Sequence, residues 1–159
     1  ERTPVNDPKA RGVVFGLTLA HTRAHLYRSA LESVGYSIAQ QIALMESHPE
    51  VHLDRVIAVG GGTQNPVWMQ IIADILGNSV DTPAETVGAC FGDAMMAALA
   101  VKHPGFESYA SLTNFIKPGR TYRPNMENHR VYQTYQQVYS ALYESTKALA
   151  HTLSDAVAE

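Results

Sequence analysis

A run of three glycines is the part of this sequence whose residue types best suit ligand binding. Gly60, Gly61 and Gly62 carry no side chains, so a flat or anionic ligand can approach their backbone closely. Asn65, a good helix cap, and Pro66, which suits the first helical position, follow. A helix that begins there offers unpaired N–H groups and the positive end of its dipole. The pattern predicts a nucleotide-binding loop; the alternative is a tight strand-to-helix turn without a ligand.

Two common nucleotide-binding motifs do not fit these glycines. A Rossmann fingerprint that used Gly60 and Gly62 would need a third glycine at position 65, which is Asn65. A P-loop counted from Gly60 would need glycine and lysine at positions 65 and 66, which are asparagine and proline. The predicted loop is therefore of neither type.

Two other places have residue types that could do chemistry. His21 and His25 are four residues apart on a predicted helix, a spacing that can hold zinc, but the glutamate of the metalloprotease pattern and a nearby cysteine are absent. We therefore favour packing or hydrogen-bonding roles for both histidines. Asp93 lies in an apolar helix and must be paired, hydrogen-bonded or facing a cleft. A structural role is the more economical interpretation of this carboxylate.

The elements around the glycines follow a strand, loop and helix order. The apolar run 56–59 predicts a buried strand of the parallel type. Apolar residues at helical spacing over 66–76 predict a helix that Gly77 ends. A second strand is expected over 78–81. The small apolar residues of 87–101 then predict a buried helix, in which Gly88 and Gly92 allow another backbone to come close.

The remaining elements lie on either side of this centre. Residues 1–12 form a polar loop, 13–17 a possible short strand, and 18–47 a helix with one apolar stripe. Residues 103–107 and 116–125 read as connecting loops. The last predicted helix spans 128–149, with four tyrosines near one face, and 150–159 are expected to fray.

Composition limits the class of protein. The chain has 159 residues, 45% hydrophobic and 17% charged, which are globular values. A net charge of −3 without a Lys/Arg cluster argues against binding nucleic acid. The single cysteine, Cys90, fits a reducing compartment, and neither a membrane-spanning run nor a signal peptide is evident. These features favour a cytoplasmic protein, and the abrupt start at Glu1 without methionine suggests a fragment of a longer one.

Three segments of the chain share their order with a known family. They are Glu1-Arg-Thr-Pro with Asp7-Pro-Lys-Ala-Arg-Gly and Gly16-Leu-Thr, the run from Gly60 to Val80, and Gly88-Ala-Cys-Phe-Gly-Asp-Ala. Together they resemble sugar kinases of the FGGY family over nearly the whole chain. Asp93 stands where alanine is commoner in the third segment. The resemblance implies that residues 1–159 belong to the family's C-terminal domain, with an α/β fold of the actin-like ATPase (ribonuclease H-like) type and a small, mainly parallel sheet flanked by helices.

The resemblance also implies the activity and the site. In the family, Gly61 and Asn65 stand where the adenosine part of ATP is contacted, and Gly60 and Gly62 shape the same turn. The parent enzyme is expected to use ATP and Mg²⁺ to phosphorylate a hydroxyl of a sugar or polyol, with a pentulose favoured by similarity to xylulose and ribulose kinases. No catalytic residue is expected in this chain, because the aspartate base and most sugar contacts belong to the family's N-terminal domain. The chain alone should be inactive.

Two further expectations can be tested. The alternative to a kinase is a non-catalytic module of the same fold that binds nucleotide or serves as a structural interaction partner. The kinase interpretation requires the turn from Gly61 to Asn65 to face an open cleft, whereas the structural one allows it to be buried. Because a truncated sheet leaves an unpaired edge or an apolar face, we also expect the chain to form homo-oligomers.

Overall fold

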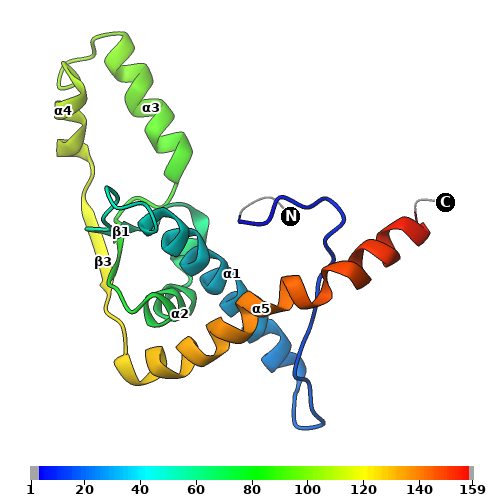
Figure 1. Cartoon of the computed structure of the whole chain (residues 1–159). Coiled ribbons are helices and arrows are strands. Elements are labelled where there is room, and N and C mark those ends of the chain that lie inside the picture. Colours follow the sequence, from blue (N-terminus) through cyan, green and yellow to red (C-terminus); the bar gives the residue numbers. More distant parts are fainter. Residues whose placement is uncertain (1–3, 158–159) are drawn as a thin grey trace. The chain divides into compact units, whose positions relative to one another are not determined.

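The computed structural model describes residues 4–157, so Glu1–Thr3 of the resemblance lie outside the described residues (Figure 1). The chain divides into two compact units. The first, called here the helical unit, comprises Glu1–Leu53 and Met126–Glu159, and the second, called the sheet unit, comprises Asp54–Asn125. Among the described helices none is long and apolar enough to span a membrane.

A three-stranded sheet forms the sheet unit, with strand order β1-β2-β3. The strands are β1 (Val56–Ile57), β2 (Val80–Pro83) and β3 (Pro118–Tyr122). β1 and β2 are parallel, as predicted, whereas β2 and β3 are antiparallel, so the sheet is mixed. The prediction of a loop over 116–125 was wrong at β3. Its Pro118 and Gly119 are typical of a turn, but a side chain at Gly119 would lie 2.6 Å from the Pro83 carbonyl oxygen, so the close strand pairing itself requires glycine.

The helix α2 (Pro66–Leu76) holds most of the core of the sheet unit. It is preceded by the 3₁₀ turn η1 (Gly61–Gln64) and packs near β2 and β3. Gly77 ends the helix, as predicted, in the left-handed conformation with φ of 68°. Its N–H donates to the Ala73 carbonyl. The apolar residues buried in this unit are Met69, Ile71, Ile72, Ala73, Ile75, Val80 and Tyr122.

The helix α3 (Gly88–Ala100) forms as predicted but is not buried. None of its residues is buried, Asp93 is exposed, and in Figure 1 the helix extends away from the sheet. The predicted burial of 56–59 is also wrong, since Ile57 and Val59 are 53% and 65% exposed. An apolar pattern shows which surface prefers to be covered, but the covering element must also be present, and the described residues provide none here. Between α3 and β3 the chain forms the short helix α4 (Tyr109–Leu112) and the 3₁₀ turn η2 (Thr113–Phe115).

Two long helices make up most of the helical unit. α1 (Arg23–Glu46) packs on α5 (Met126–Val157) (Figure 1). The Tyr36 ring contacts the rings of Tyr132 and Tyr139, with centroids 6.1 and 5.3 Å apart. Tyr132 and Tyr139 of α5 thus pack within their own unit. The predicted fraying was wrong for residues 150–157, which are helical with Ala150 buried; residues 158–159 lie outside the described part.

The segment before α1 differs from its prediction. Residues 13–17 form no strand, because no described segment pairs with them. The helix begins at Arg23 rather than residue 18. The reason is local: the side chain of His25 reaches back to the Thr22 N–H at 3.1 Å and closes a capping box. His21 bonds Thr18 in the same manner, so hydrogen-bonding roles for the two histidines are confirmed.

Candidate nucleotide-binding loop

The glycine loop connects the end of β1 to α2. The Ala58 N–H donates to the Asp81 carbonyl at 2.9 Å, which keeps the chain beside β2 after the strand ends. Gly60 then turns with φ of 97°, a conformation that strongly favours glycine, and Gly61 begins the 3₁₀ turn. The predicted order of strand, bare turn and helix is therefore confirmed.

Thr63 closes this turn from inside. Its hydroxyl donates to the Gly60 carbonyl at 2.7 Å and its N–H donates to the same oxygen at 3.1 Å. The residue is buried. Sequence reasoning missed Thr63; the available signal was a hydroxyl side chain three residues after a glycine, a spacing at which it can bond the turn's own carbonyl.

Asn65 caps α2 as predicted. Its Oδ1 accepts hydrogen bonds from the N–H groups of Val67 and Trp68, each at 3.1 Å, and Pro66 occupies the first helical position. The oxygen is therefore engaged by the helix. The Nδ2 group makes no hydrogen bond among the described residues, so this donor is the part of Asn65 available to a ligand.

The three glycines have three different surroundings. A Cβ atom at Gly60 or Gly61 would meet no atom within 4 Å, whereas one at Gly62 would lie 2.9 Å from Cζ3 of Trp68. Gly88 lies behind the loop, and a side chain there would come within 3.1 Å of the Gly60 Cα. The predicted close approach of a backbone is thus confirmed at Gly88, but Gly92 has open space. Gly61 is exposed and has neither a positive φ nor a close neighbour.

A shallow hollow adjoins Gly88 and the first turns of α3. Its volume is about 140 Å³, and apolar residues line most of it: Val59, Pro83, Phe91, Met95 and Ile116. Pockets that enclose a drug-sized ligand usually measure about 300–1,000 Å³. This hollow is therefore too small to enclose a nucleotide by itself.

The described residues form no comparable site for a metal ion. Among residues 4–157, no three His, Cys, Asp or Glu side chains are placed to hold one ion.

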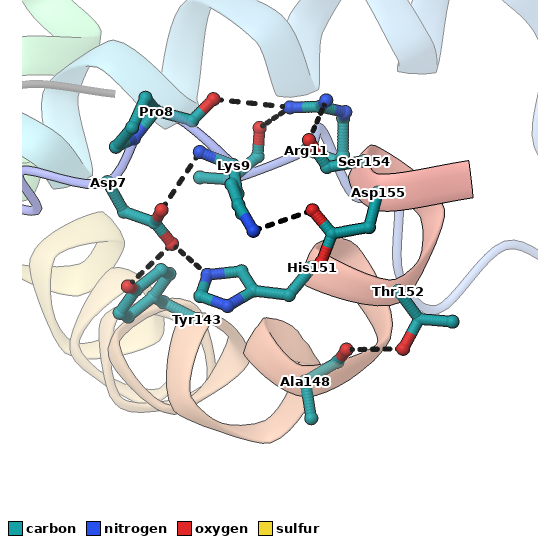
Figure 2. A network of polar contacts seen from close by, with 11 residues as sticks. Asp7, Pro8, Lys9, Arg11, Tyr143, Ala148, His151, Thr152, Ser154 and Asp155 are labelled. Carbon is teal, nitrogen blue, oxygen red and sulfur yellow. Dashed lines mark hydrogen bonds and ion pairs between the residues drawn. The ribbon is translucent and has the colours of Figure 1, made fainter. Parts of the chain in front are cut away.

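The motif Asp7-Pro-Lys-Ala-Arg-Gly lies elsewhere, in the helical unit. Figure 2 shows the Asp7 carboxylate accepting from the Tyr143 hydroxyl at 2.9 Å and from the Lys9 N–H at 2.9 Å, and pairing with His151 Nε2 at 2.7 Å. The His151 hydrogen bond is the main reason that the pKa of Asp7 falls from 3.8 to about 2. Lys9 and Asp155 add an exposed ion pair at 2.6 Å. This cluster fastens the opening loop to the C-terminal half of α5.

With this geometry established, comparison with known proteins defines the class. The crystal structure of a xylulose kinase from Rhodospirillum rubrum superposes with a TM-score of 0.75 at 32% identity, over 91% of this chain and 29% of that one. The predicted actin-like ATPase fold is thereby confirmed. The family model for the C-terminal domain of the FGGY carbohydrate kinases matches residues 1–101. The chain therefore belongs to the FGGY family of carbohydrate kinases and corresponds to part of their C-terminal domain.

Curated relatives agree on the family and differ in their substrates. A xylulose kinase from Staphylococcus epidermidis is 32% identical over 96% of this chain and 30% of its own length. A glycerol kinase from Dechloromonas aromatica is 38% identical over 80% of this chain and 25% of its own length. The chain thus spans about 30% of the length of its relatives.

Proposed function

We propose that residues 1–159 form the adenosine-binding part of a kinase that transfers the γ-phosphate of ATP to a hydroxyl group of a sugar or polyol. The observation that carries the proposal is the open space at Gly61. Gly60 is explained by its φ of 97° and Gly62 by the Trp68 ring, but nothing among the described residues requires a glycine at Gly61. A ligand that lies against the backbone would require it.

The residues of the loop would act by positioning. Catalysis of phosphoryl transfer is mostly placement of the reactants and stabilisation of charge. The bare backbone at Gly60 and Gly61 accommodates the flat adenosine part, and the Asn65 Nδ2 group donates to it. Mg²⁺, when bound with ATP, would supply charge neutralisation at the phosphates, and the general base would come from the family's other domain.

We propose a pentulose as the acceptor and the cytoplasm, where ATP is abundant, as the place of reaction. Several similar relatives are named xylulose kinases. A glycerol kinase of similar identity shows that the C-terminal segment alone leaves the acceptor open. Contacts to the acceptor are therefore expected mainly outside residues 1–159.

The test is phosphate transfer by a kinase that carries this chain, against a panel of ketoses, polyols and aldonates. We expect ATP-dependent phosphorylation, with the highest kcat/KM for a pentulose. ATP binding without transfer to any acceptor would favour the non-catalytic module instead. Turnover with a polyol or an aldonate, and not with pentuloses, would contradict the proposed substrate and support the proposed kinase activity.

We also propose that the chain self-associates. Large apolar side chains are exposed in both units, and none of the residues of α3 is buried. Such surfaces tend to find partners. Light scattering should show species larger than 17.4 kDa, and a monomer at high concentration would contradict the proposal.

A further inference from the structure

The side-chain position of Gly62 is occupied by an aromatic ring. A Cβ atom there would lie 2.9 Å from Cζ3, 3.4 Å from Cε3 and 3.7 Å from Cη2 of Trp68. The six-membered part of the indole therefore packs directly against the loop backbone. The neighbouring positions Gly60 and Gly61 have no atom within the same range. The loop thus has one supported residue next to two open ones.

Trp68 is itself held at its backbone. Its N–H donates to Asn65 Oδ1 at 3.1 Å, and the Met69 N–H donates to the Asn65 carbonyl at 3.1 Å, so the first turn of α2 is fixed to the residue that ends the loop. Further along the same helix, Ile71 and Ile75 are buried in the core. The indole that packs against Gly62 therefore belongs to the first turn of a helix that is anchored in the core further along.

We propose that Trp68 is a positioning residue for nucleotide binding: its ring sets the course of the backbone at Gly62 and thereby places Gly61 against the adenosine part of ATP. The inference rests on the proposed function, since it assumes that the loop contacts ATP. It adds the residue that controls the loop's shape. The ring acts through Gly62 and need not touch the nucleotide.

Removal of the indole tests this role in a kinase that carries the chain. Trp68→Leu leaves space behind Gly62, and we expect the KM for ATP to rise by about three- to tenfold. The kcat and the KM for the acceptor should change less than about twofold. Trp68→Phe keeps a ring in contact with the loop and should restore most of the ATP affinity. Val67→Ala, on the same helix turn and exposed, is the matched control and should leave all three constants unchanged.

A second set of variants tests the contact itself. Gly62→Ala places a methyl group against the indole and should raise the KM for ATP. In Gly62→Ala/Trp68→Leu the methyl group enters the space that the ring leaves, so the double variant should bind ATP better than the product of the two single effects predicts. Effects that simply multiply would overturn the inference.

Fluorescence gives a readout that does not depend on turnover. Trp68 is the only tryptophan of the chain, so the emission of the isolated chain reports this position alone. We expect a saturable change in emission on titration with ATP. If calorimetry detects ATP binding while the emission stays constant, Trp68 is not coupled to the loop.

Different results would contradict the proposed function and the positioning role of Trp68. If the wild-type kinase shows no saturation by ATP, the proposed function fails. If the wild type saturates and folded Trp68→Leu retains its KM for ATP, only the positioning role of Trp68 is wrong. A circular dichroism melt of each variant, with its midpoint above the assay temperature, verifies that the protein is folded in the assay.

Discussion

The two units are stabilised in different ways. In the sheet unit, α2 and β2 bury a continuous apolar core, and the polar contacts of the glycine loop join residues two or three positions apart. In the helical unit only a few residues are buried, and hydrogen bonds join side chains 100 to 144 positions apart. The sheet unit therefore has a packed core and local turns, to which polar pairs up to 53 positions apart are added, whereas the helical unit buries few residues and depends more on its long-range polar pairs.

This difference indicates where a candidate site can be precise. A loop whose geometry follows from local hydrogen bonds on a packed helix keeps its shape with little dependence on distant parts of the chain. A unit stabilised by exposed or half-exposed polar pairs responds to pH and salt. We therefore expect variants of the sheet unit to change stability and ATP binding, and variants of the helical unit to change mainly the dependence of stability on solution conditions.

The largest effect is expected in the core of the sheet unit. Ile71 is 1% exposed, and Ile71→Ala should lower the free energy of unfolding by about 2–5 kcal/mol through lost burial and a cavity. Denaturant titration with circular dichroism measures the loss. The exposed neighbour Val67, changed to alanine, should cost less than about 0.5 kcal/mol. Equal effects of the two variants would show that α2 is not the centre of the core.

A pH titration tests the helical unit. The pKa of Asp7 lies at about 2, below its ordinary 3.8, chiefly because of the hydrogen bond from His151. The carboxylate therefore contributes stability above about pH 4, and this contribution is lost as the pH falls from about 4 to about 2. Denaturant unfolding of the wild type should show this loss. Asp7→Asn should be less stable at pH 7 and should lose only the part of the acid response that Asp7 contributes, because Asp81, whose pKa is lowered by Thr121 and Arg55, keeps its own part.

The control for this titration is the exposed pair of Lys9 and Asp155. Both side chains are about half exposed, so Asp155→Asn should cost less than about 1 kcal/mol, and added salt should reduce that cost further. An Asp7→Asn variant with the pH profile of the wild type would show that the Asp7 cluster does not govern the acid response.

A smaller effect on stability is expected at the helix cap. Asn65→Ala removes the acceptor of two N–H groups and should cost about 1 kcal/mol of stability. It also removes the Nδ2 donor, so the KM for ATP should rise together with the loss of stability. Asn65→Asp keeps the cap and removes the donor. If that variant binds ATP as the wild type does, Asn65 serves the helix only.

The sequence predicted the sheet unit better than the helical unit, for a physical reason. Gly60, Asn65, Pro66 and Gly77 act on neighbours within four residues, so their types and spacing predicted the turn, the cap and the helix end. Strand β3 was missed because its Pro118 and Gly119 are turn residues, and only the pairing of Pro118 with Pro83 of β2, 35 positions away, makes them a strand.

The helical unit depends on contacts that spacing cannot reveal. Nothing near Asp7 indicates that its partners are Tyr143 and His151, more than 130 residues away. Residues 150–157, which are helical, contact the opening loop through His151, Ser154 and Asp155. Thr63 and Trp68 were missed for a different reason: their effect on the loop depends on which atoms face Gly60 and Gly62, and this requires coordinates.

The central claim is that Gly61 lies against the nucleotide, and Gly61→Val tests it most directly. The φ of Gly61 is not positive, and a Cβ atom added there would have no neighbour within 4 Å. The variant should therefore fold like the wild type. In a kinase that carries this chain, steady-state kinetics should show a raised KM for ATP with an unchanged KM for the acceptor. A folded Gly61→Val enzyme with an unaltered KM for ATP would contradict the assignment of this loop to the nucleotide.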